Sequence, residues 1–460
     1  MSSGVTIHGG SGSGAINFSF TAYGAATAAY ATQLADTVNT LLKTESTTPI
    51  DPMGQTSAKI DLGSRLDDGG GSTPVYVLQP DTTGSGNFTY QVATSGFIVD
   101  TISGIHEVDL SAAGDSIIVA GSNPGAVVNA NGPSNEVIFI SGNNTFNAGA
   151  GDTGGDTIVT GSGSDVVNTG FGDSDVIAGT GFSTIYLNDT VTGTYNDLVW
   201  LTEGRAVVYA DGTGDQVAAT AAGQTVIGAA GGTPADVLTV LLNAGSDQSL
   251  VDGGGAYANV FENSMNDTIN GGSYYMQVFA AANVTGTINA GDGSVVLFGN
   301  GGDSFQVGTQ YDSNGAATGV TTFIAGTGNE TLYGAGATSN LLVFGGSDTT
   351  AVDSLVGGSG NDWFNAGTGS ETLVGGGGNN VFLFDSAAAA GGNITIADFT
   401  ASNNTAAFSG FSASDVANAI ASGQEVNGNF VITFGSTNTT VTFDNTTASQ
   451  LTGHIVTFGS

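Results

Sequence analysis

A tandem nonapeptide repeat constrains the fold of this chain more than any other feature. Residues 357–383 read GGSGNDWFN, AGTGSETLV and GGGGNNVFL, which are three nine-residue units without a gap. Each unit has glycine in its first half and an apolar residue at its eighth position. Glycine is needed where the backbone takes positive φ or where successive coils approach closely. Each unit therefore predicts a tight turn followed by a short strand.

The same rhythm extends over most of the chain. A second block covers residues 151–178 with one inserted residue, and an isolated copy covers 325–333. From 101 to 384, Gly/Asn/Asp clusters alternate with short apolar runs at intervals of about nine to twelve residues, a period typical of a solenoid. The eighth-position residues should point inward and stack into one core. They are Ile158, Val167, Ile177, Phe364, Leu373 and Phe382.

Acidic residues at the sixth position of the units recur with the same period. Two units make one coil, so turns on one edge should recur every ~18 residues, with Asp156 and Asp175 on one edge and Asp165 on the opposite one. Stacked carboxylates repel one another unless a cation lies between them, and an all-oxygen site suits Ca²⁺. The candidate calcium ligands are Asp156, Asp165, Asp175, Asp362, Glu371 and Glu330.

Departures from the pattern leave an alternative open. The sixth position of the 357–383 block is Asp362, Glu371 and then Asn380, so the edge shared by 362 and 380 keeps one carboxylate. Few calcium sites are therefore expected, the best of them in the 151–178 block. Gly, Asn and Asp are also ordinary turn residues, and that metal-free interpretation remains possible.

These units resemble the GGxGxDxUx nonapeptide of the RTX family of type I secreted proteins. The resemblance implies a β-roll that binds Ca²⁺ between its turns, and export to the outside or the surface of a Gram-negative bacterium. Residues 385–460 look like the end domain that follows such repeats and carries the uncleaved secretion signal. From its residues alone, this stretch predicts strands around one short helix, with Ser412 and Asp415 as a capping box and Gly423 at the stop.

The first hundred residues read differently from the repeats. Residues 1–20 form a Gly/Ser-rich arm, and 21–100 predict a small helix-plus-strand domain, with helical periodicity over 21–45 and strands between 74 and 100. The apolar stripe of that helix suits either its own core or a subunit contact. The complete prediction is an all-β protein: a parallel β-roll or β-helix solenoid with a small α+β N-terminal domain and a β-rich C-terminal cap.

Charge and composition exclude several classes of function. The chain has 4 basic and 40 acidic residues, a net charge of −36, and the four cations are Lys43, Lys59, Arg65 and Arg205. So few cations cannot neutralise phosphates, which argues against nucleic-acid binding and docking on anionic lipid. No cysteine is present, no apolar run is long enough for membrane insertion, and the N-terminus lacks the pattern of a cleavable secretory signal.

No catalytic motif stands out. The histidines His8, His106 and His454 are widely separated, and HEVDL at 106–110 lacks the second histidine of a zinc-protease helix. The expected function is therefore structural and not enzymatic. We expect an extracellular, calcium-responsive protein that self-assembles into a surface layer, biofilm-matrix fibre or adhesive coat, with a cell-surface or matrix polysaccharide as a further candidate partner. The alternative is a secreted polysaccharide lyase or epimerase, which requires an exposed groove lined by acids, Tyr and a base.

Overall fold

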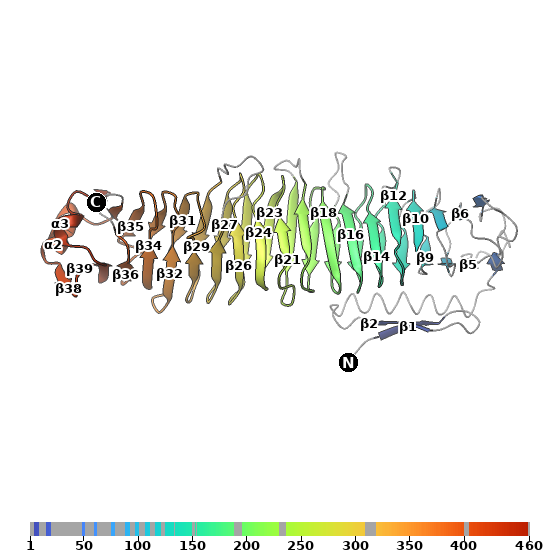
Figure 1. The fold of residues 1–460 in the computed structure, drawn as a ribbon, viewed down its shortest axis with the longest axis horizontal. Coiled ribbons are helices and arrows are strands. Elements are labelled where there is room, and N and C mark those ends of the chain that lie inside the picture. The colour runs from blue at the N-terminus through green and yellow to red at the C-terminus, as the bar shows by residue number, and fades with distance from the viewer. Residues whose placement is uncertain are drawn as a thin grey trace. The chain divides into compact units, whose positions relative to one another are not determined.

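The computed structural model describes strands β1 to β9 and Ser116 within the first 120 residues. Beyond them it describes residues 125–458 apart from 133, 150, 151, 153, 188–195, 230–235, 309–318 and 400–403. The chain divides into two compact units, Met1–Val226 and Ile227–Ser460. Strand β20 (Thr225–Gly228) contains the point of division. Figure 1 shows the succession of strands that makes up each unit.

Unit 1 is built from short parallel strands that alternate between two sheets, preceded by the antiparallel pair β1 (Gly4–His8) and β2 (Ala15–Ser19). Its odd sheet contains β3 (Thr48–Ile50), β5 (Val75–Leu78), β7 (Phe97–Asp100), β9 (Ile117–Ala120), β11 (Glu136–Phe139), β13 (Thr157–Val159), β15 (Asp175–Ala178), β17 (Leu198–Leu201) and β19 (Gln216–Ala219). Its even sheet contains β4 (Lys59–Asp61), β6 (Phe88–Val92), β8 (His106–Leu110), β10 (Ala126–Ala130), β12 (Thr145–Ala148), β14 (Ser164–Asn168), β16 (Phe182–Leu187) and β18 (Arg205–Ala210).

Unit 2 repeats this arrangement. Its odd sheet contains β21 (Val237–Leu242), β23 (Tyr257–Glu262), β25 (Met276–Ala280), β27 (Val295–Phe298), β29 (Thr321–Ile324), β31 (Leu341–Phe344), β33 (Trp363–Asn365), β35 (Val381–Asp385), β37 (Thr405–Ser409) and β41 (Ile455–Phe458). Its even sheet contains β22 (Leu250–Asp252), β24 (Met265–Asn270), β26 (Thr285–Asn289), β28 (Ser304–Val307), β30 (Thr331–Tyr333), β32 (Val352–Val356), β34 (Ser370–Val374), β36 (Asn393–Ile396) and β40 (Thr439–Phe443). From β21 to β37, each strand of the odd sheet pairs in parallel with the next one, as β33 does with β35, which is the topology of a parallel β-solenoid.

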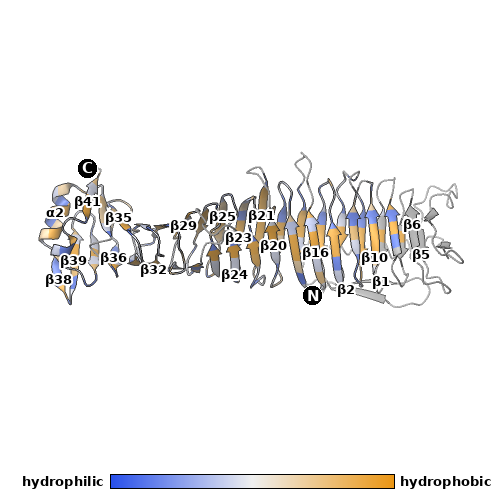
Figure 2. Cartoon of the chain, turned by 45° about the horizontal axis from the view of Figure 1, so that its top comes forward, coloured by the Kyte–Doolittle hydropathy of each residue, from blue (hydrophilic) through white to orange (hydrophobic). Residues whose placement is uncertain are grey.

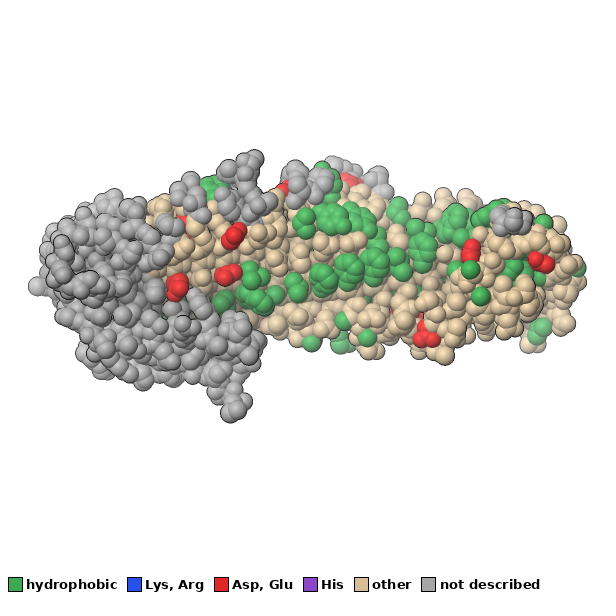
Figure 3. All heavy atoms as spheres, turned by 180° about the vertical axis from the view of Figure 1, so that it is seen from behind, with side chains coloured by type: hydrophobic (Ala, Val, Ile, Leu, Met, Phe, Trp, Pro, Cys, Tyr) green, Lys and Arg blue, Asp and Glu red, His purple; other side chains and the backbone are tan. Residues whose placement is uncertain are grey.

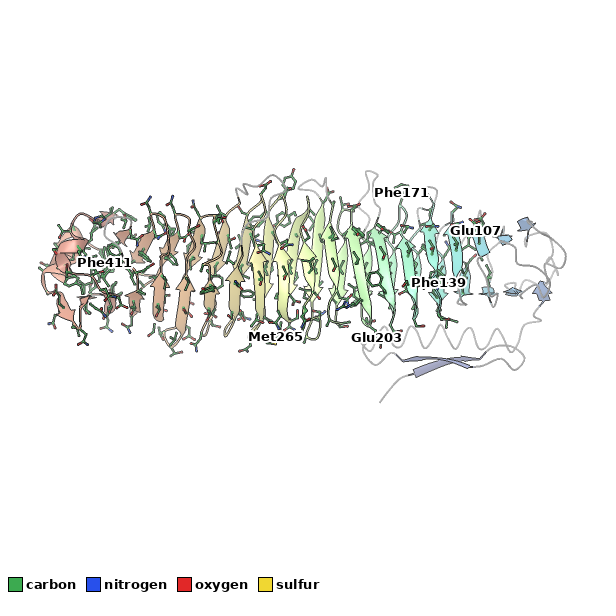
Figure 4. The ribbon with its side chains drawn as sticks, viewed as in Figure 1. Glu107, Phe139, Phe171, Glu203, Met265 and Phe411 are labelled. Atoms are coloured by element: carbon green, nitrogen blue, oxygen red, sulfur yellow. The ribbon has the colours of Figure 1, made fainter. Side chains whose placement is uncertain are left out.

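Alternation along each strand creates the core between the two sheets. Side chains of successive residues point to opposite faces of a strand, so every second residue is buried. In β16 and β18, for example, buried residues alternate with exposed or half-buried ones along the strand. Figure 2 shows hydrophobic residues concentrated in the strands. All six residues expected to point inward are buried. The register aligns Ile177 with Val159 and Val176 with Ile158, so Ile177 lies on the opposite face and the other five point inward. Phe139 points into the same interior (Figure 4). The predicted all-β parallel solenoid is therefore confirmed.

Glycine fills the turns for both predicted reasons. A Cβ added to Gly163 would lie 1.5 Å from the carbonyl oxygen of Gly142 in the preceding coil, so only glycine fits where these coils meet. Gly376 and Gly378 take φ values of 77° and 76°, which disfavour any residue with a side chain. The spacing of glycines along the chain thus reflects the closeness of successive turns.

The C-terminal cap agrees with its sequence signals. Helix α2 (Ala413–Ala421) begins at Ser412, whose side chain and that of Asp415 form the predicted capping box, and it ends at Ser422, directly before Gly423. The described residues contain one other helix, α3 (Ala448–Leu451). Strand β39 (Asn429–Phe434) runs antiparallel to β40, and β38 (Gln424–Val426) runs antiparallel to β39. The parallel order thus ends in a small antiparallel meander, beside which Phe411 lies (Figure 4).

The N-terminal prediction is only partly covered by the structure. The strands expected between 74 and 100 are present as β5, β6 and β7. They pair in parallel with β7, β8 and β9, and β3 pairs with β5 in the same way, so parallel pairing begins ahead of residue 101. The helix expected over 21–45 lies outside the described residues.

Candidate functional site

Many coils carry a polar side chain that faces inward just before a strand begins. Because side chains alternate, a residue two positions before an inward apolar residue also faces inward, as Asp165 does before Val167. Asp165 Oδ1 accepts a hydrogen bond from the backbone N–H of Asn144 at 2.9 Å, and Oδ2 accepts one from Gly161 at 3.0 Å. The carboxyl group therefore satisfies backbone N–H groups that the turn leaves without a strand partner.

In unit 1, one such column runs beside the odd sheet. Asn135, Asp156, Ser174 and Asp197 stand directly before successive strands, and all four are buried. Asp156 Oδ1 accepts from the backbone N–H of Asn135 at 2.6 Å and from its Nδ2 at 3.0 Å. Burial raises the pKa of Asp156 to about 8, although the hydrogen bonds from Asn135 act in the opposite direction.

Asp175 does not belong to this column. The register pairs Thr157 with Asp175 and Ile158 with Val176, so Ser174 takes the place next to Asp156, and Asp175 is exposed. The expected stacking of Asp156 on Asp175 is therefore wrong. The residue inserted in the third unit of the 151–178 block shifts the acid by one position, and a shift of one residue turns a side chain to the other face of the strand.

Unit 2 contains a column of four buried carboxyl groups beside its even sheet. Asp303, Glu330, Asp353 and Glu371 precede or begin successive strands, and the register places each next to the one before it. Their exposed fractions lie between 0% and 2%. We call these four residues the carboxyl column.

Backbone N–H groups satisfy one oxygen of each member of the carboxyl column. Asp303 Oδ1 accepts from Val284 at 3.0 Å, and Glu330 Oε1 accepts from Gly301 at 2.6 Å. In the next two coils, Asp353 Oδ1 accepts from Glu330 at 2.9 Å, and Glu371 Oε1 accepts from Gly367 at 2.8 Å. Each acid thus holds the backbone of its own coil or of the coil before it.

The second oxygens are less well satisfied. Glu330 Oε2, Asp353 Oδ2 and Glu371 Oε2 are buried without a hydrogen-bond partner. A charged carboxylate is costly in such a place, and protonation removes the charge. Burial raises the pKa of Glu371 to about 8, and burial together with the neighbouring Asp353 raises that of Glu330 to about 7. Glu330 and Glu371 can therefore take up and release protons near neutral and mildly alkaline pH.

Only half of the carboxyl column follows the nonapeptide pattern. Glu330 and Glu371 occupy the sixth position of recognisable units, whereas Asp303 and Asp353 stand in coils of irregular length. A shorter pattern identifies all four, since each acid is followed after one residue by an inward apolar side chain. In DSF (303–305) and DSL (353–355), for example, the third residue is buried.

Asp362 lies on the opposite edge, where the sequence placed it. Its Oδ1 accepts from the backbone N–H of Leu341 at 2.7 Å, and its own N–H donates to Asn380 Oδ1 at 2.8 Å. Asp362 and Asn380 thus share one edge, as predicted, and the edge has one carboxyl group at these two positions. The column continues to Asn404, whose Oδ1 accepts from the N–H of Asn380 at 3.0 Å.

The side chains of the six candidate calcium ligands do not all face the same side of their sheets. Asp156, Asp165, Glu330, Asp362 and Glu371 are buried and face inward, and Asp175 faces outward. Within the described part of the chain, no group of three or more His, Asp or Glu side chains is arranged to hold a metal ion. Calcium binding stays a prediction.

The outward face of the odd sheet in unit 2 carries a continuous apolar row. The register places one residue per coil in it, and we call the row the apolar ladder; its members are Leu241, Phe261, Phe279, Phe298, Ile324 and Phe344. The ring centroids of Phe261 and Phe279 lie 5.2 Å apart, and those of Phe279 and Phe298 lie 5.0 Å apart, with the rings stacked. Phe261 is 45% exposed and the others are half-buried. Figure 3 shows hydrophobic side chains gathered in rows on the face that it displays.

The outward face of the even sheet in unit 2 carries polar rows beside exposed Met265, Tyr333 and Val352. It carries one hydroxyl side chain per coil in a row that we call the hydroxyl ladder: Thr285, Ser304, Thr331, Ser354, Thr372 and Thr395. A shallow groove of about 340 Å³ lies at the start of this row. Its polar lining consists of Asn266, Thr285, Thr287, Ser304, Gln306 and Tyr333. The described residues that line the groove include no acid and no base, unlike the groove that a lyase or epimerase requires.

Among the described residues, no helix combines the length and the apolar character needed to cross a bilayer. Comparison of the chain with protein-family models, with curated proteins and with solved structures found no match.

Proposed function

We propose that this protein is an extracellular structural protein that assembles with copies of itself into a layer, fibre or coat. The observation that carries the proposal is the apolar ladder of unit 2. Contact between water and a row of large apolar side chains is unfavourable. Covering the row with another apolar surface removes this contact and lowers the free energy. Such a row is therefore a natural contact surface.

A second copy of the same chain is the occupant that the charges favour. The protein has a net charge of −36, so most of its faces repel one another. The outward residues from β21 to β33 of the odd sheet are uncharged, among them Val296, Leu342 and Trp363 in the row beside the apolar ladder. Two copies that meet there avoid carboxylate repulsion. The contact is also self-complementary, because a two-fold axis places identical rows against each other.

We include calcium in the proposal because of the nonapeptide repeats. The nonapeptide blocks at 151–178 and 357–383 are the feature shared with RTX proteins, and the export route and Gram-negative origin rest on the same resemblance. External Ca²⁺ would neutralise carboxylates exposed at the turns, such as Asp175, and so weaken the repulsion between copies. Assembly should then be stronger outside the cell, where calcium is plentiful.

Sedimentation velocity and negative-stain electron microscopy test the assembly. The test variant is Phe279→Thr with Phe298→Thr, which breaks the apolar ladder but keeps residues that favour strands. Val352→Thr with Val426→Thr is the matched control, because these valines are 60% and 45% exposed on strands outside the ladder. The wild type and the control should sediment as dimers or larger assemblies in millimolar Ca²⁺. The ladder variant should sediment as a monomer and remain folded by circular dichroism. A monomeric wild type under all conditions, or equal assembly of both variants, would contradict the proposal.

A further inference from the structure

The groove and the hydroxyl ladder lie on one face of the even sheet, and the apolar ladder lies on the odd sheet. We propose that the face of the even sheet in unit 2 binds a neutral polysaccharide in an extended conformation, with the groove holding one part of the glycan and Tyr333 stacking on a sugar ring. This binding site is separate from the surface proposed for assembly, and it stands without it.

The lining of the groove has the chemistry that sugars need. Asn266 and Gln306 offer amide donors and acceptors, and Thr285, Thr287 and Ser304 offer hydroxyl groups. Tyr333 is 52% exposed, the largest exposed fraction of any aromatic side chain in the described residues. An exposed ring beside several uncharged hydrogen-bonding groups suits a ligand with apolar C–H faces and many hydroxyl groups.

An irregularity in β24 accompanies the groove. Asn266 has a φ of 63°, and the pairing with β26 skips this residue, because Met265 pairs with Thr285 and Asp267 pairs with Gly286. A β-bulge of this kind interrupts an otherwise even surface, and bulges are frequent beside binding sites. Met265 is the first residue of β24 and lies beside the bulge (Figure 4). Its side chain is 46% exposed.

The hydroxyl ladder extends the site beyond the groove. Neighbouring strands lie about 4.8 Å apart, so a glycan that runs across the strands meets one hydroxyl side chain per coil. This spacing is similar to the length of one pyranose unit in an extended glycan. Ser304, Thr331, Ser354 and Thr372 are all exposed. An extended chain thus fits this face better than a compact oligosaccharide does.

Charge decides between neutral and acidic glycans. The last basic residue of the chain is Arg205, so unit 2 contains no Lys or Arg that could pair with a uronate or sulfate group. The net charge of −36 also repels an anionic polymer. The expected ligand is therefore a polysaccharide without charged groups.

Affinity gel electrophoresis tests the binding, with hydroxyethyl cellulose, xyloglucan and dextran as neutral polymers and alginate as the anionic one. The variants are Tyr333→Ala, which removes the ring, Tyr333→Phe, which keeps it, and Tyr274→Ala as the matched control, because Tyr274 is exposed outside the groove. At least one neutral polymer should retard the wild type, Tyr333→Phe and Tyr274→Ala alike. Loss of one stacked ring should weaken binding about tenfold in Tyr333→Ala.

A second pair of variants separates the groove from the ladder. Thr372→Val removes one hydroxyl group of the ladder without changing its shape, and Thr433→Val does the same on β39, away from the ladder. Retardation should decrease in the first variant and not in the second. The proposal is overturned if none of the neutral polymers retards the protein, if alginate retards it more strongly than they do, or if Tyr333→Ala migrates as the wild type does. Because the readout is glycan binding by soluble protein, failure of the assembly leaves this result unaffected, and the reverse also holds.

Discussion

Glu371 shows how a buried carboxyl group connects the stability of one coil to pH. Its Oε1 accepts a hydrogen bond from Gly367, whereas its Oε2 is buried without a partner. The hydrogen bond to Oε1 forms in either protonation state, but the unpartnered oxygen favours the neutral acid. The coil is therefore held by a group that prefers to keep its proton, and its stability should depend on whether that proton is present.

The first prediction concerns Glu371→Gln. The pKa of an ordinary Glu is about 4.3, and burial raises that of Glu371 to about 8. The folded state binds the proton more tightly, so the stability that this group contributes is complete below about pH 4.3 and is lost as the pH rises toward 8. Gln carries no charge at any pH, so the variant should be more stable than the wild type at pH 8.5, by an amount on the order of a few kcal/mol, and similar to it at pH 4.

Urea unfolding at several pH values measures this difference. Glu425→Gln is the matched control, because Glu425 is exposed on β38 and its replacement should change the stability little. Parallel stability curves for the wild type and Glu371→Gln between pH 4 and pH 8.5 would show that Glu371 does not titrate in this range.

A second prediction at the residue scale concerns Asp165. This buried carboxyl group accepts hydrogen bonds from the backbone N–H groups of Asn144 and Gly161. Asp165→Ala should therefore destabilise unit 1 by about 1–3 kcal/mol, the cost of leaving buried donors without a partner. Thermal unfolding at pH 5 checks it. Asp211→Ala is the matched control: Asp211 is exposed, so its replacement should change the thermal stability little.

At the scale of elements, the period of the sequence predicted the solenoid but not the register of every coil. Regular units, such as those that contain Phe364, Leu373 and Phe382, gave the inward residues directly, and so did the capping box of Ser412 and Asp415. Because of one inserted residue, the partner of Ile158 is Val176 and not the expected Ile177. The length of a turn determines the face of the sheet on which the following side chains lie. A turn can accommodate one extra residue in several conformations, so counting residues along the chain does not predict that face.

The functional surfaces were harder to predict than the core, for a physical reason. The residues of the apolar ladder come from coils up to 103 positions apart, since Leu241 and Phe344 begin and end it, and the intervals between its members are unequal. Only the pairing of strands brings them into one row. Each inward residue, by contrast, lies at a fixed distance from a turn signal in its own unit, which makes it visible locally.

Helix α2 gives a prediction at this scale. Ser412 accepts a hydrogen bond from the N–H of Asp415, and the side chain of Asp415 accepts one in return from the N–H of Ser412. Ser412→Ala should weaken the helix by about 1 kcal/mol. Hydrogen exchange of the α2 amides should then be about fivefold faster, because 1 kcal/mol corresponds to that change in the opening equilibrium. Ser436→Ala, in the exposed turn between β39 and β40, should leave these rates unchanged.

At the scale of the whole molecule, the charged residues are separate from the two surfaces that we propose for assembly and for glycan binding. The carboxyl column lies in the interior of unit 2, where the acids accept hydrogen bonds from the turns. The apolar and hydroxyl ladders lie on the outward faces of the same unit and contain no charged residue. Exposed acids such as Asp173 and Asp175 stand beside the turns. The pKa of Asp175 is raised by partial burial and by the nearby Asp173 carboxylate, so the two acids repel each other. A cation that binds between such acids would stabilise the fold.

The last prediction concerns this response to calcium. Extracellular modules bind Ca²⁺ with a Kd of about 10⁻³ M, so 10 mM Ca²⁺ should stabilise each occupied site by about 1.4 kcal/mol. For a unit of this size, that free energy corresponds to an increase in Tm of about 3–6 °C, which a chelator should reverse. Differential scanning calorimetry at pH 7.5 measures it, with NaCl at equal ionic strength as the control for simple screening. Asp173→Asn with Asp175→Asn should reduce the increase, whereas an equal Tm in calcium and in NaCl would show that the turns bind no calcium.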